Sequence, residues 1–498
     1  MTSVAAANFQ NGKTRETAAI LRSDAACLCA LAIFVVLTRL PWFGDPVADY
    51  DEQLYSFMGW RMQFGELPFV DWWDRKPFGL FAIFGIIHAL FGPSALAYQL
   101  TATAFALATA GLTYHLSRKL VDPVGAAMAG ALSAMLLVAY ASYSAQSEVF
   151  FAPLMLGMVA LLADGHNPNF TRRALLAMAL GGLALQVKYT VLPQCAFLGC
   201  WALWTEYRRG RSRGSLATLA FFYAVLGLLP TLAVGIFYAA IGEFEAFWFA
   251  NFVSFFDRAA APQGRWGADH AIGVAPLVVL ALGGLYAAFR MRRPEPFGTW
   301  LFFAGWAIST LAGVLLPGTV YLYHYAALAA PAALVALPLL DGRGPLGPWP
   351  GAILSVGFLL LLQLPERHAS SQERRDAVDT LAAAIAPHVD RNQDCLWIWD
   401  GPTVLYRLTD SCVPTRYVYP DHLNNTLETG ALGVDQVAEI DRILSGRPGA
   451  IVTADKGVTI RNPVAAERVA RALERTYEPR AVATIHGREL TAWTRRTD

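Results

Sequence analysis

The sequence predicts a polytopic α-helical membrane protein that carries a soluble α/β domain at its C-terminal end. Hydrophobic residues make up 55% of the 498 residues and charged residues 15%, with a mean hydropathy of +0.39. Soluble domains contain nearer one quarter charged residues. The composition then becomes polar after Pro365. We therefore expect a transmembrane domain over residues 1–365 and an extracytoplasmic α/β domain over residues 366–498.

The apolar runs of the first part indicate about eleven membrane-spanning helices, several near the short end of the roughly 17–25 residues that a span needs. The predicted spans are about Cys27–Leu40, Leu96–Ser117, Gly125–Tyr140, Val149–Ala163, Ala174–Thr190, Leu192–Trp204, Leu216–Ile241, Ile272–Arg290, Phe297–Leu316, Tyr325–Leu340 and Ile353–Leu364. Lys13, Arg15 and Arg22 precede the first span without a small-residue cleavage site. This pattern favours an uncleaved cytoplasmic start over a signal peptide.

The apolar segment Phe78–Phe91 has only about fourteen residues, which suits an interfacial or re-entrant helix as well as a span. The positive-inside rule decides between these, because the basic loops become cytoplasmic only if the segment does not cross. These loops are Arg118-Lys119, Arg172-Arg173, Arg208–Arg213 and Arg290–Arg293. We therefore place Phe78–Phe91 at the outer surface. The outer side then holds the loop around Asp51, three later loops (Ala141–Glu148, Glu243–His270 and Pro317–His324) and the C-terminal domain.

The first outer loop holds the densest group of polar side chains near the membrane. Asp49 and Glu52 have the three-residue spacing of a helix capping box, and Gly65 can end the helix that they begin. This helix is expected to lie in the interface, with its apolar side on the membrane and its polar side in water. Asp51 and Tyr55 are four residues apart, so both should project from one face.

Three short motifs resemble those of the GT-C glycosyltransferases, most closely the family 39 type. They are Asp51-Glu52-x-x-Tyr55, Lys76-Pro77 and His324-Tyr325. That family includes protein O-mannosyltransferases and the bacterial lipid A aminoarabinose transferases, and the resemblance covers roughly the first three-quarters of the chain. It implies an inverting enzyme that takes a sugar from a polyprenyl-phosphate carrier on the non-cytoplasmic side of the membrane.

The resemblance also implies roles for particular side chains. Asp51 would be the general base that takes the proton of an acceptor hydroxyl, and Lys76 would stabilise the departing phosphate. Glu148, in the second outer loop, resembles the second acidic group of the family by position. The weaker candidates for phosphate binding are Arg75, Lys188 and His324, and those for substrate positioning are Tyr55 and Tyr325.

Each of these residues also has an ordinary structural explanation. Asp51 or Glu148 could serve only the dipole at the start of a helix. Lys188 could extend its ammonium to the lipid headgroups, and His324 could be structural. The aromatic residues of Glu243–His270 could form an interfacial belt, or could line a groove for the lipid carrier in which Arg258 or Arg265 meets phosphate.

Strand-like and helical segments alternate in the C-terminal part, which predicts a small α/β domain. The expected strands are Cys395–Trp399, Arg416–Tyr419, Ala450–Val452 and Ala481–Ile485, and the expected helices are Val434–Leu444 and Val464–Leu473. There is no Gly-rich phosphate loop and no metal-ligand spacing, so we assign no metal site, although a divalent cation remains possible as a cofactor. Cys395 and Cys412 are alone in this domain, and an oxidising compartment favours a disulfide between them.

The sequence therefore favours an integral-membrane glycosyltransferase of the inner (plasma) membrane. Its expected partners are the lipid bilayer, a polyprenyl-phosphate sugar donor and an acceptor that is an envelope glycan, lipid or protein. Nucleic acid binding is not expected, because the basic clusters are explained by topology. Two alternatives are a flippase for a lipid-linked sugar, which should show inverted repeats, and a non-catalytic scaffold, which leaves the Asp51–Lys76 cluster unexplained.

Overall fold

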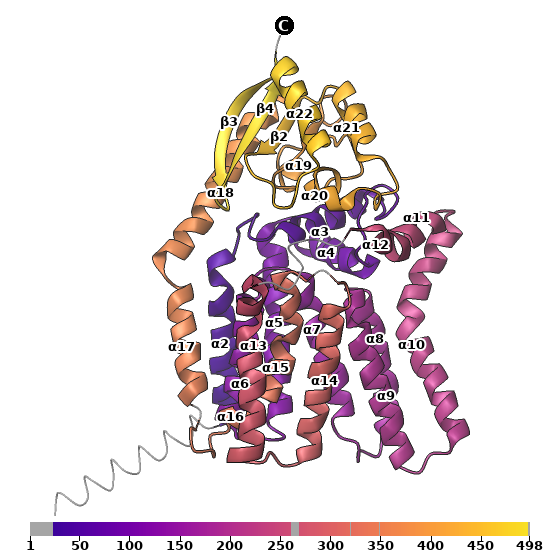
Figure 1. Cartoon of the computed structure of the whole chain (residues 1–498), viewed down its shortest axis with the longest axis vertical. Coiled ribbons are helices and arrows are strands. Elements are labelled where there is room, and N and C mark those ends of the chain that lie inside the picture. Colours follow the sequence, from indigo (N-terminus) through magenta and orange to yellow (C-terminus); the bar gives the residue numbers. More distant parts are fainter. Residues whose placement is uncertain (1–22, 260–267, 319, 348, 497–498) are drawn as a thin grey trace, which may run out of the picture.

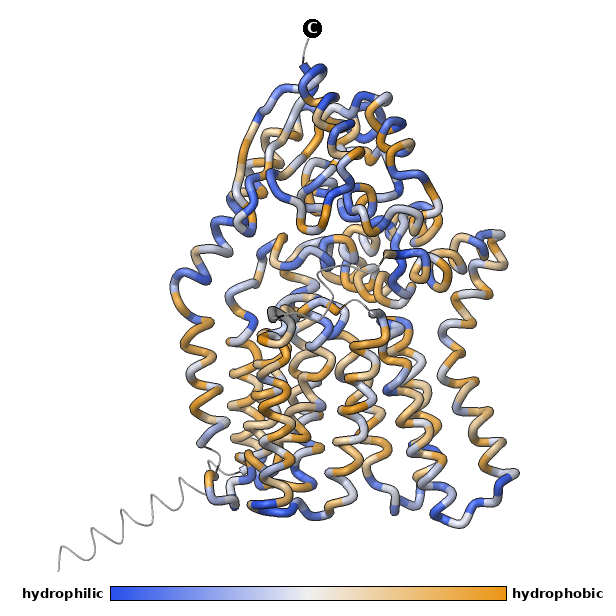
Figure 2. The backbone as a smooth tube through the Cα atoms, in the orientation of Figure 1, coloured by the Kyte–Doolittle hydropathy of each residue, from blue (hydrophilic) through white to orange (hydrophobic). Residues whose placement is uncertain are grey.

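The computed structural model describes residues 23–259, 268–318, 320–347 and 349–496, and shows a bundle of apolar helices with a small sheet at one end (Figure 1). The basic residues before the first predicted span, and Arg265, lie outside the described residues. Hydrophobic residues run the length of the bundle, and hydrophilic ones gather at its two ends and around the sheet (Figure 2). The helices of the bundle are α2 (Asp24–Arg39), α5 (Ala95–Ser117), α6 (Pro123–Ala139), α7 (Ser147–Leu162), α8 (Phe170–Leu185), α9 (Leu192–Arg208), α10 (Arg213–Ala240), α13 (Ala268–Tyr286), α14 (Phe297–Leu315), α15 (Ala329–Val335), α16 (Leu337–Leu340) and α17 (Trp349–Leu362).

The length and hydropathy of these helices make the chain a multi-pass membrane protein. Among the described residues, five helices are long and apolar enough to cross unaided, and a sixth span results if α17 and α18 (Pro365–Ile385), bent by 43°, count as one. Shorter apolar helices, such as Pro123–Ala139 and Ser147–Leu162, complete the bundle. The total of eleven spans remains a prediction.

The segment expected as one span over Tyr325–Leu340 is broken into η7 (Leu322–Leu328), α15 and α16. Pro338 lies in the first turn of α16. Proline has no backbone N–H to continue the ladder of a helix, and its ring collides with the carbonyl four residues earlier. The chain therefore stops one helix at Val335 and starts another.

The apolar segment Phe78–Phe91 forms α4, which packs beside α3 (Tyr50–Arg61) at the end of the bundle nearest the sheet (Figure 1). Gly59 allows this close packing, since a Cβ there would lie only 2.6 Å from the backbone nitrogen of Gly85. The expectation that α3 exposes a polar side to water is wrong. Every residue from Glu52 to Gly59 is buried, because the C-terminal part of the chain covers the helix.

Short helices connect the longer ones. Near α3 and α4 these are η1 (Leu40–Trp42) and η2 (Met62–Phe64). Further along the chain they are η3 (Tyr189–Val191), α11 (Phe244–Trp248), the π-helix η4 (Phe249–Val253), α12 (Ser254–Asp257) and the π-helix η6 (Ala287–Met291).

The C-terminal part is built on a four-stranded sheet with strand order β1-β2-β4-β3. Strands β1 (Leu396–Ile398) and β2 (Ala450–Ala454) are parallel, while β3 (Tyr477–Ile485) and β4 (Arg488–Arg495) form an antiparallel hairpin. The remaining helices are η8 (Ala386–His388), α19 (Leu405–Leu408), α20 (Pro420–Asn424), η9 (Thr426–Glu428), α21 (Gln436–Ser445) and α22 (Pro463–Thr476). Buried apolar contacts continue from this sheet into α3, where the Phe57 and Tyr406 rings lie 5.7 Å apart.

Strands occur at three of the four expected positions, and helices at both. The predicted strand Arg416–Tyr419 is wrong, because the carbonyl oxygen of Arg416 accepts a hydrogen bond from the backbone N–H of Trp73 (3.1 Å) instead of joining the sheet. Strand β4 was not predicted. It follows a two-residue turn in which both His486 and Gly487 have positive φ, the geometry of a tight hairpin.

Cys395 and Cys412 form a disulfide, with their Cα atoms 4.6 Å apart. It ties the start of β1 to the loop after α19. The described cysteines outside this disulfide are Cys27, Cys29, Cys195 and Cys200, which all lie in bundle helices.

Candidate functional site

The start of α3 fixes the position of the Asp51 side chain. Asp49 is the N-cap residue, and its carboxylate accepts hydrogen bonds from the backbone N–H groups of Asp51 (2.9 Å) and Glu52 (3.3 Å). Asp51 therefore lies in the first turn, and Tyr55 lies one turn further on the same face. The Tyr55 hydroxyl donates a hydrogen bond to Asp51 Oδ2 (3.2 Å). The four-residue spacing thus produces the pair that it indicates.

Two more donors reach the Asp51 carboxylate from distant parts of the chain. Gln146, before α7, donates from Nε2 to Oδ2 (3.1 Å), and the Tyr419 hydroxyl, before α20, donates to Oδ1 (3.1 Å). Sequence reasoning missed both residues. Gln146 stands two positions before Glu148, which was a usable signal, but nothing local marks Tyr419. Three donors from three segments together fix the orientation of the carboxylate.

Glu52 does not complete the expected capping box. Its side chain turns into the protein and accepts a hydrogen bond from the backbone N–H of Ala145 (2.7 Å). Glu52 is fully buried, and this burial raises the pKa of its carboxyl group to about 7. The residue joins the first outer loop to the second, so it supports the arrangement around Asp51.

Lys76 lies beside the same tyrosine, with its ammonium 5.4 Å from the centre of the Tyr55 ring. Burial lowers the pKa of Lys76, but the carboxylates of Asp74 and Asp51 outweigh burial and raise it above its ordinary value. Within the described part of the chain, no group accepts a hydrogen bond from this ammonium. A half-buried cation that keeps its charge and its three donors is suited to bind an anionic group.

Arg75 and Arg258 are both occupied by Glu428. The guanidinium of Arg75 makes two parallel hydrogen bonds to the Glu428 carboxylate, and the Nε of Arg258 donates to the same carboxylate (2.6 Å). Burial raises the pKa of Glu428, but the two arginines outweigh it and hold that pKa below its usual range. These residues join the first outer loop, the α12 segment and the C-terminal part. Neither arginine is free for phosphate in this arrangement.

Lys188 and Glu148 form a buried ion pair, with 2.5 Å between Nζ and Oε1. Lys188 is 7% exposed and does not extend to the headgroups. Its ammonium also lies 5.0 Å from the centre of the Tyr323 ring. The charge of Lys188 is therefore balanced by Glu148, which brings two predicted site residues together as partners of each other.

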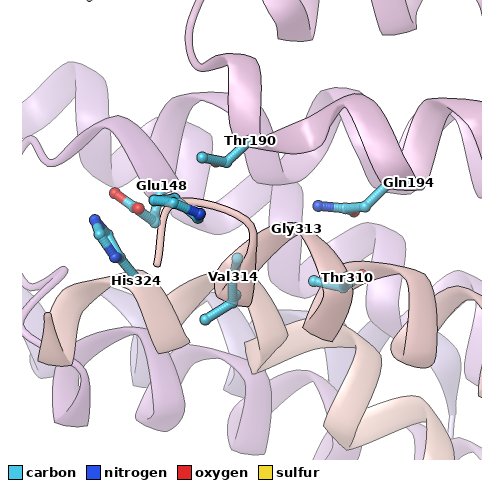
Figure 3. Close-up of a pocket in the computed structure, with 9 residues that line it drawn as sticks. Glu148, Thr190, Gln194, Thr310, Gly313, Val314 and His324 are labelled. Atoms are coloured by element: carbon cyan, nitrogen blue, oxygen red, sulfur yellow. The ribbon is translucent and has the colours of Figure 1, made fainter. Parts of the chain in front are cut away.

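A small pocket of about 10 Å³ lies next to this ion pair. Figure 3 shows Glu148 and His324 at one end of the pocket, with Gln194 and Thr310 at the other. His324 Nδ1 accepts a hydrogen bond from the backbone N–H of Tyr321 (3.3 Å), so this side chain helps to shape its own turn. The pocket has room for about one water molecule and is too small for a sugar.

Tyr325 packs against Tyr140, with ring centroids 5.8 Å apart. Tyr323 faces Lys188 instead. The reason is the 3₁₀ geometry of η7, in which each residue turns about 120° and residues two apart face different sides. The substrate-positioning role of Tyr325 stays a prediction.

An open groove of about 640 Å³ lies between the first outer loop and the C-terminal part. Four of its charged side chains form two ion pairs, Arg61 with Glu66 and Arg442 with Glu439. Among the described residues, no group of three or more His, Cys, Asp or Glu side chains is arranged to hold a metal ion. The Asp51 cluster therefore remains the candidate site.

Comparisons with known proteins point to one fold. Residues 75–234 match the family model described as dolichyl-phosphate-mannose-protein mannosyltransferase, a range that includes Lys76, Glu148 and Lys188. The crystal structure of ArnT from Cupriavidus metallidurans bound to undecaprenyl phosphate is similar with a TM-score of 0.62, at 17% identity, over 94% of this chain and 97% of that chain. The apo structure of ArnT from the same organism gives a TM-score of 0.61 at 17% identity, over 94% and 98%. No curated protein sequence matches the chain.

Proposed function

We propose that this chain, a membrane glycosyltransferase with the GT-C fold, moves a sugar from a polyprenyl-phosphate carrier to a hydroxyl group of a cell-envelope acceptor. The observation that carries this proposal is the arrangement around Tyr55. Its hydroxyl donates a hydrogen bond to Asp51, and the Lys76 ammonium, which donates no hydrogen bond to the described residues, lies over its ring. The Asp51 carboxylate and the Lys76 ammonium therefore both contact Tyr55, one at its hydroxyl and the other at its ring.

These two groups suit the two ends of a sugar transfer. Asp51 takes the proton of the acceptor hydroxyl while its oxygen attacks the anomeric carbon. The bond between that carbon and the phosphate oxygen breaks, and the electron pair leaves with the phosphate, whose charge Lys76 stabilises. A positioned base typically contributes about 10²–10⁴-fold to the rate, and a cation placed where charge develops contributes further. Attack opposite the leaving group inverts the anomeric configuration.

The undecaprenyl phosphate bound in ArnT supports a polyprenyl-phosphate carrier for this chain. The acceptor is a glycolipid, a polysaccharide or a protein. Among the earlier phosphate candidates, Lys76 is the available cation, whereas Arg75 and Lys188 act in this proposal by holding Glu428 and Glu148.

The site and the C-terminal domain, residues 366–498, face the extracytoplasmic side of the inner membrane in this proposal. Two observations support it. The α9–α10 connection, which contains the basic run Arg208–Arg213, lies at the end of the bundle opposite the sheet (Figure 1). The disulfide between Cys395 and Cys412 is the kind of bond that persists in an oxidising compartment.

The proposed function is tested by mass spectrometry of surface glycans, glycolipids and glycoproteins from cells with and without the gene. We expect one class of molecule to lose a single sugar residue in the deletion strain. The wild-type gene should restore that sugar, and the Asp51→Asn gene should not. Identical glycan, glycolipid and glycoprotein profiles in all strains would contradict the proposal.

A further inference from the structure

Tyr419 belongs to the C-terminal part of the chain, yet its hydroxyl reaches the proposed base. It lies 368 positions after Asp51 and is the residue that precedes α20. The segment that carries it is fixed to the first outer loop. The Arg416 guanidinium donates to the carbonyl oxygen of Phe69, and the Arg416 carbonyl oxygen accepts from the N–H of Trp73.

The hydrogen bonds of the Asp51 carboxylate leave one position open. A carboxylate has two oxygens with about four lone-pair sites in total. Tyr55 and Gln146 both donate to Oδ2, and Tyr419 donates to Oδ1. Among the described residues these three are the side chains that donate to Asp51. The remaining lone pair is therefore on Oδ1, next to the Tyr419 hydroxyl.

The Tyr419 hydroxyl acts as a donor here and not as a second base. Burial, followed by the nearby Asp51 carboxylate, raises the pKa of Tyr419 well above its ordinary value, so the phenol keeps its proton. The other titratable groups that interact with Asp51 are Asp49, Tyr55, Lys76 and Tyr323. Replacing Tyr419 by phenylalanine leaves all four in place.

We infer that Tyr419 is a positioning residue: it orients Asp51 so that Oδ1 takes the proton, and it directs the acceptor hydroxyl to approach between α3 and the segment before α20. The C-terminal part of the chain thereby completes the site instead of merely covering it. This inference rests on the proposed function, in which Asp51 is the base. It predicts that removal of one oxygen atom from the C-terminal part slows transfer without weakening the binding of the carrier.

The test compares Tyr419→Phe with Tyr417→Phe in the full-length protein. Tyr417 is a matched control because it is buried in the same segment and its hydroxyl donates to the carbonyl oxygen of Leu432 (3.1 Å), not to Asp51. Turnover is measured with undecaprenyl-phosphate mannose, or with the undecaprenyl-phosphate sugar that the wild type uses, and an envelope extract as acceptor. Binding of undecaprenyl phosphate gives the folded fraction to which each rate is normalised.

We expect Tyr419→Phe to lower kcat about 10- to 100-fold, the range in which hydrogen bonds to charged groups act. The acidic limb of its pH–rate profile should move about one pH unit higher, because a carboxylate that loses a donor is protonated more easily. Carrier binding should stay within about two-fold. Tyr417→Phe should keep the wild-type kcat and pH profile even where its unfolding temperature falls.

Equal kcat values and pH profiles for the two variants, at the same folded fraction, would overturn the inference. The Asp51→Asn protein separates this failure from that of the proposed function. If Asp51→Asn is inactive while Tyr419→Phe resembles the wild type, only the role of Tyr419 is wrong. If Asp51→Asn turns over normally, the base itself is wrong, and the role of Tyr419 is overturned with it.

Discussion

Lys76 and Arg75 are neighbours in sequence but differ in what their charges do. The guanidinium of Arg75 forms an ion pair with Glu428. The Lys76 ammonium instead lies over the Tyr55 ring and interacts electrostatically with nearby carboxylates. The difference follows from shape, because the planar fork of arginine fits a carboxylate with two parallel hydrogen bonds and an ammonium acts as a point charge. At the scale of single residues, Arg75 therefore joins parts of the chain together, and Lys76 is the cation that a substrate can reach in the proposed function.

We expect Lys76→Ala to weaken binding of undecaprenyl phosphate about 10- to 100-fold and to lower turnover as well, because the phosphate loses its cation in both ground and transition states. Binding is measured by isothermal calorimetry in detergent. Lys456→Ala is the control, since Lys456 is exposed in the C-terminal part and its ammonium lies 3.8 Å from Asp455. Equal affinities for the two variants would refute the role of Lys76.

Glu52 makes the stability of the protein depend on pH. Burial raises its folded-state pKa to about 7, from an ordinary value of 4.5. Between these values the folded protein holds a proton that the unfolded chain has lost, so stability falls as the pH rises from 4.5 to 7. The linked loss is roughly 3 kcal/mol at most. Glu52→Gln removes the titration and should unfold at a higher temperature than the wild type at pH 8, with little difference at pH 5.

Thermal unfolding in detergent at the two pH values measures this effect. Glu366→Gln is the control, because Glu366 is exposed at the start of α18 and should change neither curve. The account of Glu52 fails if its glutamine variant shows the same pH dependence as the wild type.

The pair α3 and α4 is the element that presents Asp51. Gly59 lets the two helices touch, because a Cβ there would meet backbone atoms of Phe84 and Gly85 at 2.6–2.7 Å. Backbone cannot move aside as a flexible side chain can, so Gly59→Ala should push α3 from α4. We expect a loss of stability of about 1–3 kcal/mol and a comparable loss of transfer activity.

Gly111→Ala is the matched control for Gly59→Ala. Gly111 lies inside α5 and a Cβ there would meet nothing within 4 Å, so alanine should be neutral or slightly stabilising. Unfolding temperature and transfer rate are measured for both. If both glycine variants match the wild type, the close approach of α3 to α4 does not matter for the site.

At the scale of the whole molecule, local sequence patterns predicted the elements better than the contacts between them. The Asp49 cap and the Asp51–Tyr55 pair both depend on residues close in sequence. The bonds of Asp51 with Tyr419 and of Arg75 with Glu428 join residues 368 and 353 positions apart. No periodicity or spacing encodes such contacts, which depend on how the C-terminal part docks. For the same reason, the burial of α3 could not be predicted from its own residues.

The arrangement of the whole chain in the membrane gives a topological prediction. Single cysteines at Ser94 and Ser212, in a chain without the four cysteines outside the disulfide, should react with a membrane-impermeant reagent from opposite sides. Ser94 lies exposed before α5 and Ser212 lies exposed before α10, and Ser94 should react from the outside. If Ser94 reacts only from the inside and Ser212 only from the outside, α4 crosses the membrane, and the proposed position of the site would be wrong.

The central claim is that Asp51 is the base of a sugar transfer from a polyprenyl-phosphate carrier. The direct test measures transfer by Asp51→Asn protein in liposomes, together with its binding of undecaprenyl phosphate. Asparagine keeps the shape of the side chain but cannot take up the proton, so turnover should fall about 10²–10⁴-fold while carrier binding and membrane insertion persist. Asp49→Asn is the control, because asparagine also caps a helix well and should leave turnover nearly unchanged. Near-normal turnover by Asp51→Asn would contradict the account and would make Glu148 the next carboxylate to test.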